Sequence, residues 1–198
     1  MNDKTRTSVY IDFDGVIVDT IAGIVELYNE DFRYYKNFKE IYPDEIQTYD
    51  FKECSCASKE IINSYFNTPR LFKTLEKMPG AWDSIWTLTE HFSVKVVSHG
   101  YSPNLALKKD WIELALPYGI EFQGANLKYH NDKSSVDMSG GIFIDDKLIN
   151  LETSNAAYKI LFGNEYDWNR GYDPKKICRC YNWEEVMETI NKIMGETL

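Results

Sequence analysis

The sequence predicts an α/β fold with a mainly parallel sheet, helices on both faces, and a helical insertion after the first strand. Three observations predict it. Short apolar runs alternate with amphipathic segments through the last two thirds of the chain, as in strands joined by crossover helices. The stretch from about Val18 to Met78 has few strand signals. Acidic residues end two of the apolar runs, at the sheet edge where open α/β folds bind ligands.

The first predicted elements are a buried strand and a helix. The apolar run from Ser8 to Ile11 predicts a strand whose carboxyl end carries the acidic residues up to Asp14. Asp19 or Thr20 is suited to cap the following helix. Its apolar residues recur at helical spacing: Ile21, Ile24, Val25, Tyr28 and Phe32.

The rest of the insertion is aromatic and charged. Pro43 breaks the stretch from Tyr34 to Phe51, and a second helix is predicted from Ser58 to Phe66. Pro69 is expected to end that region. We therefore expect residues 18–78 to form a helical cap, and residues 1–17 with 79–198 to form the core that carries the sheet.

Strands and helices alternate after Pro79 and Gly80. The helix expected from Ala81 to about His91 should bury Trp82, Ile85, Trp86 and Thr89. The later predicted elements are a strand at 94–98, a helix at 104–116, strands at 120–122, 142–145, 158–162 and 177–181, and a final helix capped by Asn182.

Composition limits the class of protein. The chain has 198 residues, of which 43% are hydrophobic, enough for a core and too many for global disorder. A formal charge of -9 argues against general binding to nucleic acid or a membrane surface, but a metal and one or two lysines could still attract a small anion. No leader or apolar membrane span is evident, since residues 1–7 are polar; a cytoplasmic protein is expected.

The four cysteines occur in two closely spaced pairs. Cys54 and Cys56 form one pair, and Cys178 and Cys180 form the other. Two such pairs could bind zinc, although the usual spacing within a pair is wider. Ordinary reduced thiols are the simpler interpretation.

Asp12 and Asp14 form the most informative motif. They follow a buried strand and point to the same side of an extended backbone. The first carboxylate could attack an electrophile while the second protonates a leaving oxygen and later activates water. Because Asp-Gly is also a common turn pair, Asp14 with Gly15 alone would be compatible with a simple turn.

A second acidic pair, Asp145 and Asp146, ends the apolar run 141–144. Adjacent carboxylates repel one another unless a cation or a proton relieves them, and magnesium binds oxygen ligands of this kind. The alternative is a helix cap, with Asp146 capping a segment that begins at Lys147. A cap accounts for one of the two aspartates.

Two further residues could bind a phosphoryl group. Ser98 ends a predicted strand, and its hydroxyl with the backbone amides of His99 and Gly100 could bind a phosphoryl oxygen. Lys133 precedes Asp145 by twelve residues and could offset carboxylate charge. Alone, the serine could be a turn residue and the lysine a solvated side chain.

Together these elements resemble the haloacid dehalogenase superfamily of aspartate-nucleophile phosphatases. The match rests on "DFDGV", the serine of "VKVVS", a lysine and "IDD", in that order. A closer resemblance is to the 5'(3')-deoxyribonucleotidases, through "DFDGVIVDT", "MPGAW", "LKKDWIE", "NDKSSVDMSGGIFIDD" and "NWEEV". It implies a doubly wound, Rossmann-type core with a small helical cap, although residues 34–72 depart from the family pattern.

The resemblance implies a magnesium-dependent phosphatase. Asp12 would be the nucleophile that forms an aspartyl-phosphate, and Asp14 the general acid and base. Both would contribute to the Mg²⁺ site, Asp14 through its backbone carbonyl. Asp145 and Asp146 would complete it, with Asp146 favoured as the direct ligand. A non-catalytic nucleotide-binding protein is the alternative from another functional class.

The same resemblance assigns phosphoryl binding to Ser98 and a lysine. Lys133 is favoured because residues 131–146 follow the family pattern, and Lys108 and Lys109 are its rivals. The implied substrate is a nucleoside monophosphate, with another small phosphate ester, such as a sugar phosphate, as the alternative. No nucleic-acid or membrane partner is expected, and a homodimer is compatible with the sequence.

Aromatic residues of the insertion could stack on a nucleobase. Tyr49 and Phe51 match a family substrate-contact stretch loosely, and Thr20 falls where the family has a residue at the cap entrance. These three are the predicted substrate contacts outside the core. The preferences for base, for deoxyribose or ribose, and for a 5' or 3' phosphate stay open.

Overall fold

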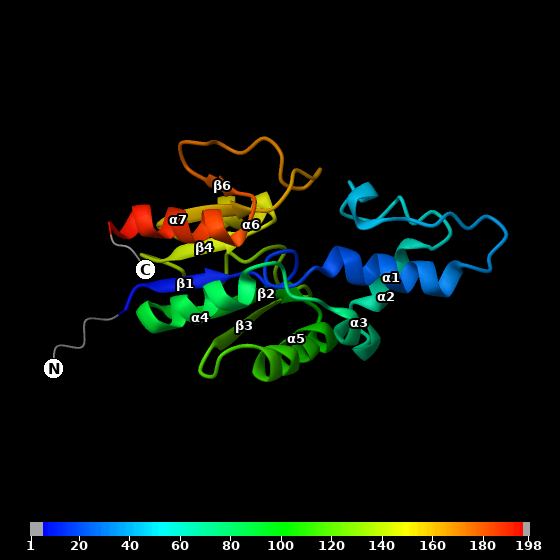
Figure 1. Cartoon of the computed structure of the whole chain (residues 1–198), viewed down its shortest axis with the longest axis horizontal. Coiled ribbons are helices and arrows are strands. Elements are labelled where there is room, and N and C mark those ends of the chain that lie inside the picture. Colours follow the sequence, from blue (N-terminus) through cyan, green and yellow to red (C-terminus); the bar gives the residue numbers. More distant parts are fainter. Residues whose placement is uncertain (1–5, 196–198) are drawn as a thin grey trace.

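The computed structural model describes residues 6–195; residues 1–5 and 196–198, which belong to the predicted core and include most of the polar start of the chain, lie outside the described residues. It contains a six-stranded parallel sheet in the order β3-β2-β1-β4-β5-β6 (Figure 1). The strands are β1 (Ser8–Ile11), β2 (Ser93–Gly100), β3 (Glu121–Asn126), β4 (Ile142–Asp145), β5 (Tyr158–Phe162) and β6 (Cys178–Cys180). This confirms the predicted α/β class.

The helices of the sheet region are α4 (Ala81–His91), α5 (Ser102–Ala115), α6 (Leu148–Thr153) and α7 (Trp183–Met194). Buried residues of α4, α5 and α7 pack with β1, β2, β4 and β5 in one hydrophobic cluster. Leu151 of α6 and Met138 belong to a second cluster with Tyr10 and Phe143, which face the other way on β1 and β4. The sheet is therefore covered on both faces, as predicted.

The order in which strands are added to the sheet changes side between β1 and β4. From β1 the chain proceeds to β2 and β3 on one side, and the later strands β4, β5 and β6 add on the other side. Crossover connections thus diverge at the carboxyl ends of β1 and β4, which leaves a crevice there. Asp12 follows β1 and Asp145 ends β4, so both acidic motifs lie at this switch point.

Between β1 and α4 lies a separate group of helices, here called the helical segment (residues 20–74). It comprises α1 (Thr20–Phe32), a 3-10 helix (Pro43–Glu45), α2 (Lys59–Tyr65) and α3 (Pro69–Thr74). Its buried residues, among them Leu27, Tyr28 and Leu71, form their own hydrophobic cluster. The segment lies beyond the carboxyl ends of the strands (Figure 1) and contacts α5 through α3.

Local capping agrees with the sequence. The Asp19 side chain accepts a hydrogen bond of 2.9 Å from the Ala22 backbone N–H at the start of α1, and Asn182 accepts one of 2.9 Å from Glu185 at the start of α7. The alternative interpretation of Asp146 as a helix cap is not what the structure has, because the N-cap residue of α6 is Lys147, with no side-chain cap hydrogen bond. Its backbone N–H instead donates to Asp145 Oδ1 at 2.8 Å.

Two predictions about the helices are corrected. Pro69 starts α3 rather than ending the region, since proline is well suited to the first turn of a helix. In α4, Ala81, Ile85 and Leu88 are the buried residues, whereas Trp82 and Trp86 are 37% and 52% exposed. The Lys77 ammonium lies 4.9 Å from the Trp82 ring centre, which gives that exposed indole a cationic partner.

The edge strand is longer than predicted. β3 continues to Asn126, past the predicted end at Phe122, because backbone pairing with β2 holds the less apolar residues that follow.

All four cysteines are free thiols, two of them buried. Among the described residues, no helix is both long and apolar enough to cross a bilayer.

Candidate active site

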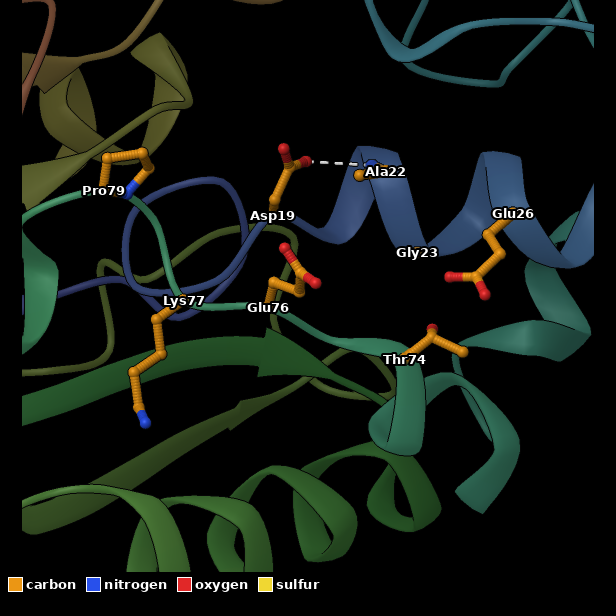
Figure 2. Close-up of a pocket in the computed structure, with 8 residues that line it drawn as sticks. All are labelled: Asp19, Ala22, Gly23, Glu26, Thr74, Glu76, Lys77 and Pro79. Atoms are coloured by element: carbon orange, nitrogen blue, oxygen red, sulfur yellow. Dashed lines mark hydrogen bonds between the residues drawn. The ribbon is translucent and has the colours of Figure 1, made fainter.

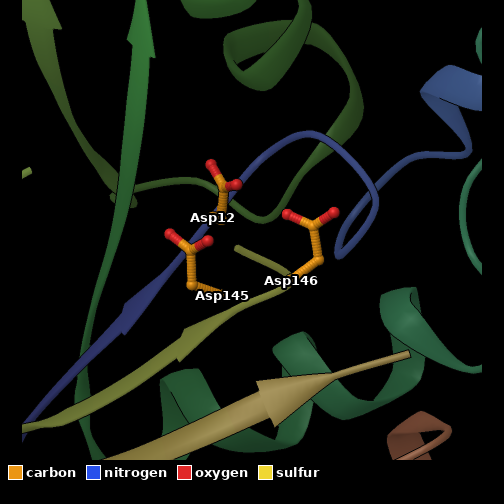
Figure 3. A group of neighbouring side chains, drawn as sticks. All are labelled: Asp12, Asp145 and Asp146. Carbon is orange, nitrogen blue, oxygen red and sulfur yellow. The ribbon is translucent and has the colours of Figure 1, made fainter. Parts of the chain in front are cut away.

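The two acidic motifs meet because their strands are neighbours. Ile11 pairs with Ile144, and the Asp12 backbone N–H donates to the Ile144 carbonyl at 2.9 Å. Carboxylate oxygens of Asp12, Asp145 and Asp146 all lie within 4.8 Å of one another (Figure 3). Three hard oxygen donors at this spacing fit a divalent cation such as Mg²⁺.

Lys133 connects the two strand ends. Its ammonium lies 2.5 Å from Asp12 Oδ1 and 2.6 Å from Asp145 Oδ2, and all three side chains are buried. Asp145 also accepts hydrogen bonds from the Lys147 backbone N–H and from Asn150 Nδ2, at 2.8 Å and 3.1 Å. Both oxygens of Asp145 are therefore already engaged by donors of the chain.

A second buried lysine contacts Ser98 and Asp14. Lys108, on α5, donates to Ser98 Oγ at 2.8 Å and forms a close ion pair with Asp14. The other oxygen of Asp14 accepts a hydrogen bond of 2.8 Å from the Thr20 hydroxyl. Of the two lysines predicted as alternatives to Lys133, Lys108 is therefore in the site. Lys109 is exposed, and its Nζ lies 3.7 Å from Glu113 Oε1.

With all four of its carboxylates ionised, the site carries more negative charge than its two buried lysines balance. Two ammonium groups contact three carboxylates, those of Asp12, Asp14 and Asp145. The fourth carboxylate, Asp146, accepts a hydrogen bond of 3.0 Å from the neutral indole of Trp168. A bound divalent cation would offset the two remaining negative charges.

Burial and mutual repulsion perturb the acidic groups. Desolvation, with the nearby carboxylates of Asp145 and Asp14, raises the pKa of Asp12 to about 7, against the opposing effect of Lys133. Desolvation and the carboxylates of Asp145 and Asp12 raise the pKa of Asp146 well above its ordinary value. Although desolvation alone would lower the pKa of Lys133, its two carboxylate partners raise it.

A cavity of about 370 Å³ opens over these groups. Asp12 and Asp146 line it, and the helical segment contributes aromatic side chains such as Phe66 to its lining. Of the predicted site residues, the cavity is lined by Asp12, Asp14, Thr20, Tyr49, Phe51, His99, Gly100, Lys133 and Asp146. Ser98 and Asp145 are fully buried beside them. This volume is at the small end of typical ligand sites.

A smaller cavity of about 220 Å³ lies where α1 meets the chain that returns to the sheet (Figure 2). Asp19, Glu26, Glu76 and Lys77 are among the residues that line it. It is lined by none of the predicted site residues, which places the candidate active site in the larger cavity.

Three of the unpredicted side chains at the large cavity donate hydrogen bonds to the site or to the helical segment. Asn150 contacts Asp145, Trp168 contacts Asp146, and Asn104 Nδ2 donates to the Phe66 carbonyl of the helical segment at 2.6 Å. Trp168 follows β5 and could have been suspected, since its loop leaves the sheet at the acidic edge. Neither asparagine had a distinctive sequence signal.

Gly100→Ala is expected to disturb the contact between the sheet region and the helical segment. A Cβ at Gly100 would overlap Oδ1 of Asn104, which is 3% exposed and bonded to Phe66. Overpacking of this kind costs about 1–3 kcal/mol of unfolding free energy. Chemical denaturation checks this, and in an Asn104→Ala background the same substitution should cost less. Equal costs in both backgrounds would contradict the proposed overlap.

The sequence matches the model of the protein family described as "5' nucleotidase, deoxy (Pyrimidine), cytosolic type C protein" over residues 6–195. The chain belongs to this family. The membership bears out the resemblance to haloacid dehalogenase phosphatases of the deoxyribonucleotidase type and makes the chain a phosphatase of that superfamily. No curated protein matches the sequence.

Solved structures with the same fold share little sequence with this family member. A predicted phosphatase from Clostridium acetobutylicum has a TM-score of 0.65 at 16% identity, covering 97% of this chain and 100% of that one. A HAD-superfamily hydrolase from Ehrlichia chaffeensis has a TM-score of 0.60 at 14% identity, covering 96% and 98%. A HAD-hydrolase from Bacillus subtilis, described as bound to magnesium, has a TM-score of 0.58 at 14% identity, covering 95% and 100%. At such identities the likeness shows the fold.

Proposed function

We propose that this chain is a magnesium-dependent phosphatase of nucleoside monophosphates, acting on 5'(3')-deoxyribonucleotides through an aspartyl-phosphate intermediate. The observation that supports this proposal most strongly is the buried Asp12 carboxylate, which lines the cavity beside Lys133 and two further carboxylates. Family membership supports the nucleotide as substrate. The expected role in deoxyribonucleotide catabolism follows from that substrate.

The metal site would use Asp12, Asp146 and the backbone carbonyl of Asp14. Asp146 is favoured over Asp145 as the direct ligand, because Lys133, Lys147 and Asn150 already donate to the oxygens of Asp145. When bound, the cation would supply positive charge to the oxygens of the transferring phosphoryl group. Asp145 would then orient Lys133 and contribute to the metal site through water or at longer range.

The side chains of the site divide the reaction between them. An oxygen of Asp12 attacks phosphorus, and the bond from phosphorus to the nucleoside oxygen breaks while Asp14 gives that oxygen its proton. Asp14 then takes a proton from the water that attacks the aspartyl-phosphate, which releases inorganic phosphate and frees Asp12. Lys133 and Ser98 bind the phosphoryl oxygens, supported by the amides of His99 and Gly100.

Lys108 has a different proposed role from Lys133. Its contacts are with Ser98 and Asp14, not with the nucleophile. An ammonium at this position holds the hydroxyl and the general acid in place on one side of the phosphoryl site. Lys133 contacts Asp12 directly and is favoured as the lysine that neutralises the transferring group.

The helical segment would act as the cap, with the boundaries predicted from the sequence: residues 18–78 for the cap, 1–17 and 79–198 for the core. Tyr49 and Phe51 line the cavity from the cap side and could stack on the base, and Thr20 lines it beside Asp14. The expected setting is cytoplasmic, with a small-molecule substrate and no nucleic-acid or membrane partner. A homodimer is compatible with this arrangement.

Comparison of kcat/KM across a substrate panel tests the proposed substrate class. The panel contains dUMP, dTMP, dAMP, UMP, their 3' isomers and several sugar phosphates, all with Mg²⁺ in excess. The proposal predicts the highest kcat/KM for deoxynucleoside monophosphates. Hydrolysis confined to sugar phosphates would contradict the nucleotide assignment, and turnover of none would favour a non-catalytic binding protein.

Magnesium should stabilise the protein more at high pH than at low pH. Because the pKa of Asp12 is raised to about 7 from an unfolded value near 4, the folded apoprotein holds a proton that the unfolded chain releases. The stability of the apoprotein therefore falls as pH rises from about 4 to about 7. Magnesium needs ionised carboxylates, so it competes with the proton on Asp12 below about pH 7.

The measurement is the rise in Tm caused by a fixed Mg²⁺ concentration at about pH 5 and about pH 8. We expect a larger rise at the higher pH, and a small rise at either pH in Asp146→Asn. An equal rise at both values, or an unchanged rise in Asp146→Asn, would argue against this metal site.

A further inference from the structure

The loop between β5 and β6, residues 163–177, extends from the sheet toward the helical segment (Figure 1). Two contacts join them. The Asp167 backbone N–H donates to the Gln47 carbonyl at 3.2 Å, and the Trp168 ring meets the Tyr49 ring edge to face, with centres 5.9 Å apart at 72°. This loop therefore contacts the helical segment independently of Asn104 on α5.

Trp168 is held firmly within that loop. Its ring stacks on Tyr166 with centres 4.3 Å apart and planes 4° from parallel. The next residue, Asn169, is fully buried; its side chain donates to the Asn164 carbonyl at 2.9 Å, and its own carbonyl accepts from Arg179 at 2.8 Å. The indole thus has a fixed orientation before any ligand binds.

The indole N–H is directed at the acidic cluster. Trp168 Nε1 donates to Asp146 Oδ2 at 3.0 Å, and a Cβ at Gly15 would lie 3.0 Å from that same oxygen. The carboxylate is confined between the indole and the Gly15 backbone, with one oxygen engaged. Its Oδ1 is then left to bind a cation. Hydrogen bonds of this kind orient metal-binding carboxylates and tune their affinity.

We propose that Trp168 is a positioning residue for Asp146 and that it links the orientation of this carboxylate to the helical segment through Tyr49. The inference rests on the metal site of the proposed function, and it adds a residue outside the sequence motifs. When the helical segment lies against the loop, Tyr49 and Tyr166 together fix the indole. When the segment moves away, the contact with Tyr49 is lost. Movement of the helical segment and the affinity of the site for Mg²⁺ are therefore coupled.

Trp168→Phe separates the hydrogen bond from the ring contacts, because phenylalanine keeps an aromatic ring and lacks the N–H. Direct Mg²⁺ titration by calorimetry, without substrate, is the readout. We expect about 10-fold weaker Mg²⁺ binding, as is common when a group that orients a metal ligand is lost. Trp86→Phe is the matched control, since Trp86 is exposed on α4 away from the site, and it should bind Mg²⁺ like the wild type.

A second substitution tests the link to the helical segment. Tyr49→Ala should weaken Mg²⁺ binding in the wild type, by less than the about 10-fold loss expected when the hydrogen bond itself is removed. It should cause no further loss in Trp168→Phe, where no N–H is left to orient. Tyr34→Ala, which removes a tyrosine that is 85% exposed on the same segment, is the control and should change nothing.

The outcomes separate this inference from the proposed function. Wild-type protein that binds no Mg²⁺ would overturn the metal site itself. Wild-type binding with an equal affinity in a folded Trp168→Phe would overturn the role of Trp168 alone. Additive losses in the double variant would overturn the link through Tyr49, and circular dichroism of each variant shows that it is folded.

Discussion

Asp12→Asn is expected to lower phosphate release from nucleoside monophosphates by about 10⁴-fold or more, the scale seen when a covalent nucleophile is removed. Asparagine has nearly the shape of aspartate but cannot form the aspartyl-phosphate. The substitution also removes one of the two carboxylates that contact Lys133, so its ammonium keeps only Asp145. Phosphate release under saturating substrate and Mg²⁺ measures the effect.

A matched carboxylate distinguishes this loss from a general effect of charge. Asp137 is exposed and accepts hydrogen bonds from Ser139 and Asn155, and none of these three residues lines the large cavity. Asp137→Asn makes the same chemical change and should retain wild-type turnover. Residual activity above about a tenth of wild type in a folded Asp12→Asn would contradict the assignment of the nucleophile.

Asp14→Asn is expected to lower nucleotide turnover by about 10²–10⁴-fold, the usual contribution of a general acid and base. Asp14 lines the cavity, and its carboxylate is oriented by Thr20 on one oxygen and Lys108 on the other. The nucleoside oxygen is a poor leaving group that needs a proton. Formation of the phosphoenzyme from p-nitrophenyl phosphate should suffer less, because that leaving group departs without one.

The same variant should accumulate the covalent intermediate. Water attack on the aspartyl-phosphate also needs Asp14, so the phosphoryl group should persist on Asp14→Asn given the aryl ester and be visible by intact-protein mass spectrometry. Thr20→Val, which removes only the hydrogen bond to Asp14, should show a smaller loss of turnover and little accumulation. If Asp14→Asn slowed the reactions of the nucleotide and of p-nitrophenyl phosphate equally, and no covalent intermediate accumulated, the acid–base role of Asp14 would be contradicted.

The sheet could be predicted from the sequence because its strands are short, apolar and bounded by clear turn residues. Ile142–Asp145 is the best example: a fully buried strand that ends in one acid and is followed by another, with no competing helical period. The meeting of Asp12 with Asp145 was also predictable, since parallel strands bring their carboxyl ends to one edge. The pairing of β1 with β4, which the structure shows, places the two acidic motifs side by side.

Contacts that depend on the path of loops and on helix rotation could not be read from the sequence. The pattern of α4 allowed either its tryptophans or its aliphatic residues to face the sheet, and packing favoured Ile85 and Leu88. Lys108 and Lys109 were both candidates from the sequence, and the rotation of α5, which directs Lys108 at Ser98, decides between them. The contact of Trp168 with Tyr49 joins residues far apart in the chain, for which no local pattern exists.

The most direct test of the account is phosphate release from dUMP by the wild-type protein, with Mg²⁺, after removal of Mg²⁺ by EDTA, and after its restoration, in parallel with Asp12→Asn. The proposed mechanism predicts that phosphate release requires Mg²⁺, returns when Mg²⁺ is restored, and is lost in Asp12→Asn. Release that continues in EDTA or in Asp12→Asn, or no release under any of these conditions, would contradict it.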